Sequence, residues 1–250
     1  MNPVYGATAA ARQGDVSAEL IRAIVNLVGT GPVPLGAYTA AEIFSVGGLI
    51  EFLEQEPSQE AISEAVRSLA ARDLITTDPG DEYIEVRGDL GIAVAFQQRT
   101  RLVVDARLTG TEPDTPWRFL LMPQPEKVTL EVRIDALGIH FYSLRTSTNA
   151  LDRLLERLPS GDRGPEDADL DAVLSASPKT ALVTVTSWPE SGAREKTDVV
   201  LAREGEHLHV FLRDPGRPDR FKAQGIDRDA LRRLMERLVM VPSSAVASSG

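Results

Sequence analysis

The amino-acid sequence predicts an α+β protein in which two antiparallel sheet-plus-helix units follow a helical amino-terminal region. The first observation is that residues 149–158 (NALDRLLERL) and 229–238 (DALRRLMERL) are identical at seven of ten positions. Secondly, each of these helices follows segments with alternating apolar residues, the pattern of strands with one buried face. Thirdly, apolar residues before residue 98 recur at helical spacing. Internal similarity of this kind indicates one pseudo-symmetric unit, βββ(β)α, used twice.

Residues 17–98 are predicted to be mainly helical, with features of a winged helix. A first helix begins at Ser17, and Ser58 is suited to cap a later one. The short strands LIT and YIEV, on either side of a DPGD turn, follow that later helix. Between these helices, residues 29–38 are predicted as an extended connector, because two prolines disfavour helix there. Residues 39–56 are predicted as a helix interrupted by two glycines.

From residue 101 the apolar spacing changes to two, which predicts strands. The predicted strands are residues 101–108, 117–122, 128–135 and 138–145 in the first unit, and 179–188, 196–204 and 207–214 in the second. Residues 128–142 align without a gap to residues 198–212, which pairs Phe141 with Phe211. Since a small sheet with one helix buries its face poorly, we expect the two units to share one sheet or core.

Each repeated helix has an apolar stripe at positions i, i+3, i+4 and i+7, suited to packing on a sheet. Leu154 and Leu234 are therefore expected to be buried. Residues 159–169, rich in Pro, Gly and acidic side chains, are predicted to form a surface linker. The predicted organisation begins with a disordered amino terminus (1–16), the winged-helix-like region (17–98) and the first unit (99–160). A linker with a short helix (161–177), the second unit (178–241) and a disordered tail (242–250) follow.

The charge of the chain is uneven, which bears on its partners. The net charge is −10, and residues 1–98 hold five basic and 14 acidic side chains. Because acidic surfaces repel phosphate backbones, we expect a protein partner and no nucleic acid. The apolar stretches are shorter than the roughly 20 residues of a membrane span, and the first residues lack the pattern of a secretory signal. A cytoplasmic protein without membrane insertion is expected, and a homo-oligomer is compatible with the sequence.

No motif for catalysis or cofactor binding stands out, so no catalytic residue and no cofactor are predicted. The chain has no cysteine, which excludes thiol catalysis, disulfides and Cys-ligated zinc. His207 and His209 would point to one side of a strand, a spacing found in some zinc sites. No third ligand is apparent, so a structural role is favoured and no metal site is predicted. An enzyme with catalytic groups far apart in the sequence is one alternative interpretation.

A DNA-binding winged helix is the other alternative. The helix after Ser58 carries Glu60, Glu64, Arg67 and Arg72, whose charges cancel, and the DPGDE turn is acidic. A helix that reads DNA ordinarily carries a surplus of Lys or Arg. A transcription regulator is therefore the first alternative to a protein-binding role, and an uncharacterised enzyme is the second.

Trp117 and Trp188 stand beside prolines, one in each unit. Tryptophan is highly buried on average, yet an exposed tryptophan can anchor a protein partner. A core position is favoured for both residues, and the anchor remains the alternative.

The order of these elements resembles that of the EspG family, the cytosolic chaperones of type VII (ESX) secretion in mycobacteria and other actinobacteria. The segments that carry the resemblance are AIVNLVGTGPVPLGAY, AVRSLAARDLITTDPGDEYIEV, TRLVVDARL and LDRLLERLP, within residues 18–241. Residues 69–75 (LAARDLI) match a family phrase in which Leu and two residues precede Arg-Gly-Leu-Val and a turn. Asp73 stands where the family commonly has Gly.

The resemblance implies a non-enzymatic chaperone that binds a helical secretion substrate of the PE-PPE type in the cytosol. Such a chaperone covers an exposed apolar tip of its client and directs it to a secretion system. By analogy with the family, the loop joining the first two strands, Gly110 to Pro116, and the adjoining Trp117 are a candidate contact. From this loop, Thr111, Glu112 and Asp114 are predicted to bind the partner protein. The two tryptophans, Trp117 and Trp188, are added to them as predicted protein-binding residues. The 159–169 linker is a further exposed candidate.

Overall fold

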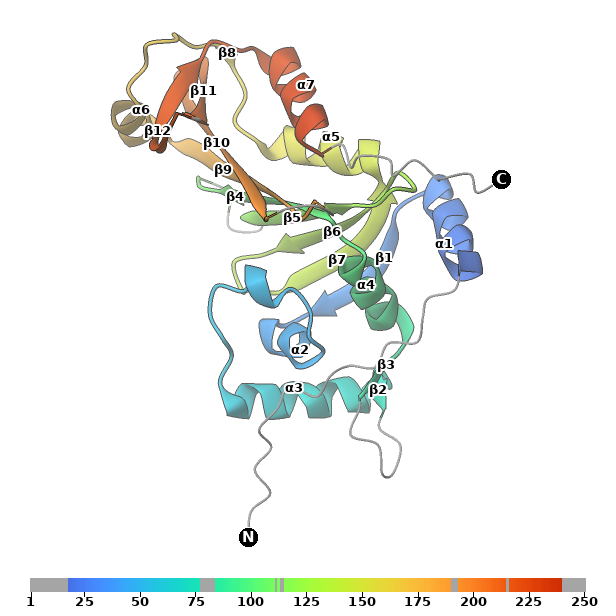
Figure 1. Cartoon of the computed structure of the whole chain (residues 1–250). Helices are drawn as coiled ribbons and strands as arrows, with labels where there is room; N and C mark the ends of the chain where they lie inside the picture. The colour runs from blue at the N-terminus through green and yellow to red at the C-terminus, as the bar shows by residue number, and fades with distance from the viewer. Residues whose placement is uncertain are drawn as a thin grey trace.

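One large sheet runs through the protein, with helices on both faces (Figure 1). The structure, a computed structural model, describes residues 18–76, 84–110, 112, 115–189, 193–214 and 216–239. The sheet has ten strands, all antiparallel to their neighbours except the short β8. This arrangement confirms the α+β class.

The two halves of the sheet follow the same order of four strands and a helix. The first half comprises β4 (Leu102–Leu108), β5 (Arg118–Pro123), β6 (Val128–Ile134), β7 (His140–Thr146) and α5 (Ser147–Arg157). The second comprises β9 (Lys179–Ser187), β10 (Glu195–Glu204), β11 (His207–Asp214), β12 (Arg217–Gln224) and α7 (Arg228–Val239). The spatial order is β1-β7-β6-β5-β4-β9-β10-β11-β12, so β4 and β9 pair at the junction of the halves.

Helices α5 and α7 lie together on one face of the sheet (Figure 1). Leu154 of α5 and Met235 of α7 are fully buried in one apolar core with residues of β4, β5, β9, β10 and β11. The two helices touch, and the Arg232 guanidinium lies 2.5 Å from the Asp152 carboxylate. The expectation for Leu234 was only partly right, because this side chain is half-buried at the margin of the core.

The alignment that paired Phe141 with Phe211 was wrong. Residues 135–139 form the turn between β6 and β7, whereas only Gly205 and Glu206 join β10 to β11. The shorter turn shifts the register of β11 relative to β7 by an odd number of residues, and side chains alternate between faces of a strand. Phe211 therefore packs on the face opposite α7, where α6 (Leu170–Ala176) lies.

The amino-terminal region covers the other face of the first half (Figure 1). Its helices are α1 (Ala18–Thr30), α2 (Ala40–Ser45), the short 3-10 helix η1 (Ile50–Phe52), α3 (Gln59–Ala71) and α4 (Gly88–Gln98). Leu90, Val94 and Phe96 of α4 are buried at the centre of this layer. Sequence reasoning did not predict α4, since its residues are apolar on most sides and form no single stripe.

The segment predicted as a connector is a strand, β1 (Val33–Tyr38), which pairs with β7 at the edge of the sheet. Proline lacks a backbone N–H and is tolerated on edge strands, and the pairing register shifts between Pro34 and Gly36. The helix predicted over residues 39–56 is only α2, begun by a capping box of Thr39 and Glu42, and η1.

The winged-helix features are present only in part. Ser58 caps α3 as predicted, and β2 (Ile75–Thr76) pairs with β3 (Glu85–Val86), while the DPGD turn lies outside the described residues. However, β1 joins the main sheet and not this hairpin. The helices of this region share one apolar core with strands of the first unit, so the two parts are packed together.

The predicted linker, residues 159–169, is not free of the sheet. It contains β8 (Asp162–Arg163), which pairs in parallel with the start of β11. The Asp162 N–H donates to Glu206 O at 2.8 Å, and the Gly164 N–H donates to Leu208 O at 3.0 Å. A side chain on Gly164 would collide with that carbonyl, since its Cβ would lie 2.7 Å away. The predicted disordered ends, residues 1–16 and 242–250, lie outside the described residues.

Candidate functional site

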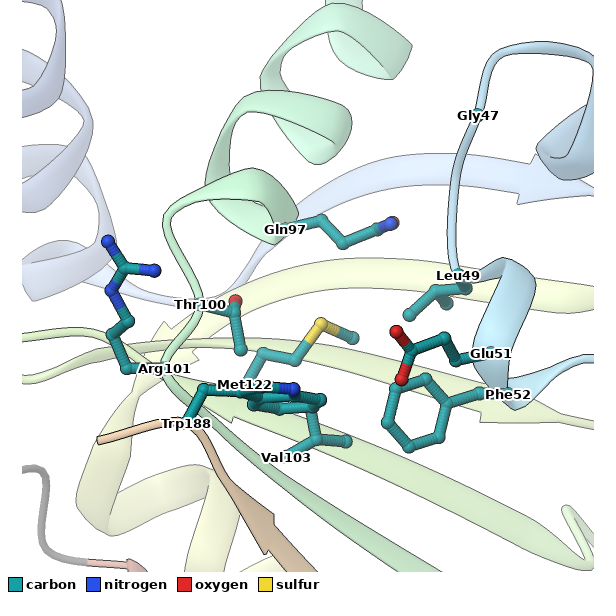
Figure 2. A pocket seen from close by; sticks show the side chains of 10 residues that line it. All are labelled: Gly47, Leu49, Glu51, Phe52, Gln97, Thr100, Arg101, Val103, Met122 and Trp188. Carbon is teal, nitrogen blue, oxygen red and sulfur yellow. The ribbon is translucent and has the colours of Figure 1, made fainter. Parts of the chain in front are cut away.

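A hollow of about 390 Å³ opens on the face of the sheet that carries the amino-terminal helices (Figure 2). It lies between η1, the end of α4, strands β4 and β5, and the residue that follows β9. Its lining residues come from four separate parts of the chain, namely Gly47, Leu49, Glu51, Phe52, Gln97, Thr100, Arg101, Val103, Met122 and Trp188. The volume lies in the range of small ligand pockets.

Trp188 is held at the hollow by the pairing of β4 with β9. Its backbone N–H donates to Arg101 O at 2.9 Å, just beyond the last paired residues of the two strands. The indole ring meets the Phe52 ring edge to face, with centroids 6.4 Å apart. The Arg194 guanidinium lies over the indole, 5.5 Å from its centroid. Both aromatic side chains are half-buried, so each retains surface that a partner can cover.

The floor of the hollow is apolar and its rim is charged. Val103 and Met122 are buried beneath it and belong to central strands. Figure 2 shows Arg101 at one end of the hollow and Glu51 at the other. The Glu51 carboxylate lies 3.4 Å from the Arg194 guanidinium, whereas Arg101 has no carboxylate within 4.0 Å among the described residues.

The Thr100 hydroxyl in the lining makes hydrogen bonds within the protein. The Thr100 hydroxyl donates to Phe96 O at 3.0 Å and accepts from Gln124 Nε2 at 3.1 Å. The lining residues include no His, Cys or Ser. The arrangement is suited to holding an apolar side chain between aromatic walls, with charged groups at the rim to fix its orientation.

A buried ion pair anchors the wall of the hollow to the sheet. Arg118, only 1% exposed, donates from Nε and Nη2 to the two carboxylate oxygens of Asp105, each at 2.8 Å. Glu54, just after η1, lies 3.6 Å from Arg107 and 4.0 Å from Arg118. This network connects the chain after Phe52 with β4 and β5, which limits how far the wall can move.

The two predicted tryptophans do not form one surface. Trp117 precedes β5, and its backbone O accepts from the Leu108 N–H at one end of β4, whereas Trp188 lies at the other end. The Trp117 indole N–H donates to Asp135 O at 2.9 Å, and the ring packs on the core. Both indole rings are half-buried against the same core, but only Trp188 lines the hollow.

The predicted contact loop between β4 and β5 is described only in part. Glu112 is exposed, whereas Thr111 and Asp114 lie outside the described residues. The start of the loop is tied to β9, because the Thr109 N–H donates to Thr180 O at 2.9 Å. Gly110 has φ +66°, and a Cβ there would lie 2.0 Å from Pro178 O, so only glycine fits this approach.

The histidines on β11 do not assemble a metal site with other described residues. The His207 and His209 rings are 6.5 Å apart, His209 is buried and His207 is exposed. No group of three or more His, Cys, Asp or Glu side chains suited to a metal occurs in the described part of the chain.

Sequence reasoning missed Phe52, Met122 and Gln97 as site residues. Phe52 fits the apolar pattern of its predicted helix, and Met122 fits that of a buried strand. Neither pattern distinguishes a residue beside a hollow from an ordinary core residue. The nearest usable signal was the prediction that Trp188 is either a core residue or an anchor.

No protein-family model matches the sequence, and no curated protein shows significant similarity to it. Within the described ranges, no helix has the length and apolar character needed to cross a bilayer.

Proposed function

We propose that the protein is a non-enzymatic chaperone or adaptor that binds another polypeptide at the hollow beside Trp188. The observation that carries this proposal is the edge-to-face pair of Trp188 and Phe52 at an open hollow with an apolar floor. Tryptophan is enriched among the few residues that dominate binding energy in protein interfaces, and such residues lie in pockets surrounded by polar groups.

The construction of the hollow also supports binding without large rearrangement. Its floor belongs to the central strands, and Glu54 ties the chain after η1 to Arg107 and Arg118. A preformed pocket reduces the conformational entropy that is lost when a partner binds. A partner that inserts an apolar side chain between Phe52 and Trp188 would therefore gain burial at low cost to the protein.

In the specific form suggested by the EspG resemblance, the client is a helical secretion substrate of the PE-PPE type. The protein would bind it in the cytoplasm, keep it soluble and direct it to a type VII secretion system. The succession of four strands and a helix in both halves supports this form, because the resemblance implies two such halves. Glu112, exposed between β4 and β5, would belong to a second contact surface.

The test begins with affinity purification of the tagged protein from its native host and identification of the copurifying polypeptide. The affinity of the purified pair is then measured by calorimetry for the wild type and for Trp188→Ala and Phe52→Ala. We expect each variant to bind at least about tenfold more weakly, as hot-spot truncations do. Leu137→Ala is the matched control, since Leu137 is an apolar residue 86% exposed on the β6–β7 turn.

Two results would count against the proposal. One is a client whose affinity is unchanged in both aromatic variants, which would place the interface elsewhere. The other is tight, salt-sensitive binding of random duplex DNA by the protein, which would favour the transcription regulator.

A further inference from the structure

Three arginines lie within 4.0 Å of one buried carboxylate on the face of the sheet opposite the hollow, and the charge of a fourth, Arg157, acts on one of them. Arg145 Nε of β7 and Arg133 Nε of β6 lie 3.1 and 3.4 Å from Glu131 Oε1. Arg153 Nε of α5 lies 3.6 Å from Glu131 Oε2, and Arg157 follows one helical turn later. We call Arg133, Arg145, Arg153 and Arg157 the arginine cluster. Three different elements therefore bring positive charge to one place.

The positive charge of the arginine cluster exceeds what its neighbours neutralise. Among the described residues, Glu131 is the one carboxylate within 4.0 Å of any of the four guanidinium groups. Burial lowers the pKa of Arg133, Glu131 opposes this change, and the charges of the three other arginines lower the pKa further. Like charges that are only partly solvated repel one another. A surplus of three positive charges thus remains in a protein whose net charge is −10.

The cluster also holds hydrogen-bond donors without acceptors. The Nε atoms of Arg133 and Arg153 are buried and make no hydrogen bond, and Glu131 Oε2 also lacks a donor. The terminal nitrogens of these two arginines make no hydrogen bond to described residues either. Since the two Nε atoms are buried beside Glu131, the donors that a bound acceptor could reach are the terminal nitrogens.

The exposure of the side chains shows how a ligand could approach. Glu131 is fully buried and Arg145 is 11% exposed, whereas Arg133 and Arg153 are 30% and 32% exposed. Glu131 and Arg145 therefore form a buried ion pair beneath Arg133 and Arg153, which reach solvent. The planar guanidinium group matches the oxygens of phosphate and can bind them in pairs.

We propose that the arginine cluster binds a phosphate group, as free phosphate or as a phosphate monoester, held chiefly by Arg133 and Arg153. A phosphate dianion neutralises more of the surplus of three positive charges than a ligand with a single carboxylate would. The site is independent of the hollow, because Glu131 points away from it, whereas Leu130 and Val132 pack under the amino-terminal helices.

Calorimetric titration with inorganic phosphate, in sodium chloride of matched ionic strength, tests this proposal. We expect saturable binding by the wild type, and a loss of at least about tenfold in affinity for the double variant Arg133→Gln, Arg153→Gln. The matched control is Arg67→Gln, Arg203→Gln, which removes two arginines paired with Glu64 and Glu206 at 2.8 and 3.3 Å. This control should bind phosphate like the wild type.

A second measurement shows whether the double variant still folds. In chloride alone, the double variant should still unfold in one cooperative thermal transition, because Arg145, whose Nε lies 3.1 Å from Glu131 Oε1, remains to pair with the buried carboxylate. Phosphate should raise the melting temperature of the wild type and not that of the variant.

A titration with the phosphopeptide Ac-Ala-pSer-Ala-NH2 distinguishes the two sources of the phosphate group. Tighter binding than inorganic phosphate assigns the site to a monoester on a polypeptide, and equal binding assigns it to the phosphate group alone. The proposal is overturned if the wild type shows no binding of either probe, or if the double variant binds both as the wild type does.

Discussion

The ion pair between Asp105 and Arg118 ties β4 to β5 beneath the candidate site. The Arg118 side chain is 1% exposed, so its charge has no access to water if the carboxylate is removed. We predict that Asp105→Ala lowers the free energy of unfolding by about 3–5 kcal/mol, because the buried guanidinium then keeps only the half-exposed Glu54 carboxylate, 4.0 Å away. Urea unfolding at pH 7 measures this loss.

The control is an ion pair of the same kind at the surface. Glu85 and Arg87 lie 2.6 Å apart with side chains 55% and 52% exposed. Glu85→Ala should cost less than about 1 kcal/mol, since exposed ion pairs contribute little. Equal losses in the two variants would show that Arg118 is solvated and that the network does not anchor the wall of the hollow.

The raised pKa of Tyr38 leads us to expect a loss of folding stability at alkaline pH. Burial, with a smaller contribution from Asp89, raises the pKa of the Tyr38 hydroxyl from 10.0 to about 12. The unfolded chain therefore releases this proton at lower pH than the folded protein does. The Tyr38 contribution to stability is fully present below pH 10 and is lost as pH rises towards about 12.

Tyr38→Phe isolates this contribution. The hydroxyl donates to Leu35 O at 2.7 Å, and its removal should cost about 1 kcal/mol at pH 7. Between pH 10 and pH 12 the wild type should lose more stability than the variant, so their difference narrows. A difference that stays constant over this range, measured by urea unfolding, would mean that Tyr38 ionises like an exposed tyrosine.

At the residue scale, sequence reasoning treated Trp117 and Trp188 alike, and the structure separates them. Both are large aromatic residues beside prolines at strand ends, so local sequence gives them the same expectation. Their environments differ through distant residues, since Asp135 O accepts from Trp117 and the Phe52 ring contacts Trp188. Contacts of this kind depend on tertiary packing, which no local pattern encodes.

At the element scale, α5 and α7 have almost the same sequence but not the same burial. Leu154 is fully buried, whereas its counterpart Leu234 is half-buried at the margin of the same core. We predict that Leu154→Ala lowers the free energy of unfolding by about 2–5 kcal/mol, the range for buried leucines. Leu234→Ala should cost clearly less in the same urea experiment. Equal costs would contradict the placement of α7 at the margin.

The elements that sequence reasoning predicted are those with a clear apolar pattern. Strands β4 to β7 and β9 to β11 alternate or run in apolar residues, which marks them as strands, and the apolar stripes of α5 and α7 indicate their buried faces. The patterns do not show that strands such as β5 are buried on both faces. The missed elements lack that signal. Strand β1 contains a proline and depends on pairing with β7, and β12 is dominated by charged residues. Helix α4 is enclosed by the other helices and the sheet, so its apolar residues show no period.

At the scale of the whole molecule, the two halves share one sheet, and the expectation that they lie side by side follows from incomplete burial of each half. The existence and position of the hollow could not be predicted from the incomplete burial of each half. It is formed where η1, the end of α4, and strands β4, β5 and β9 meet, and these segments approach only in the folded protein. The arginine cluster likewise joins β6, β7 and α5, whose arginines look like ordinary surface charges in the sequence.

The central claim is that another polypeptide binds at the hollow beside Trp188. Photo-crosslinking of the purified complex tests it most directly, with p-benzoylphenylalanine at position 52 and, as control, at position 137. Leu137 is 86% exposed on the β6–β7 turn, at the end of the strands opposite Trp188. The account predicts an adduct between position 52 and the partner, mapped by mass spectrometry, and none from position 137. An adduct from position 137 with none from position 52 would contradict it.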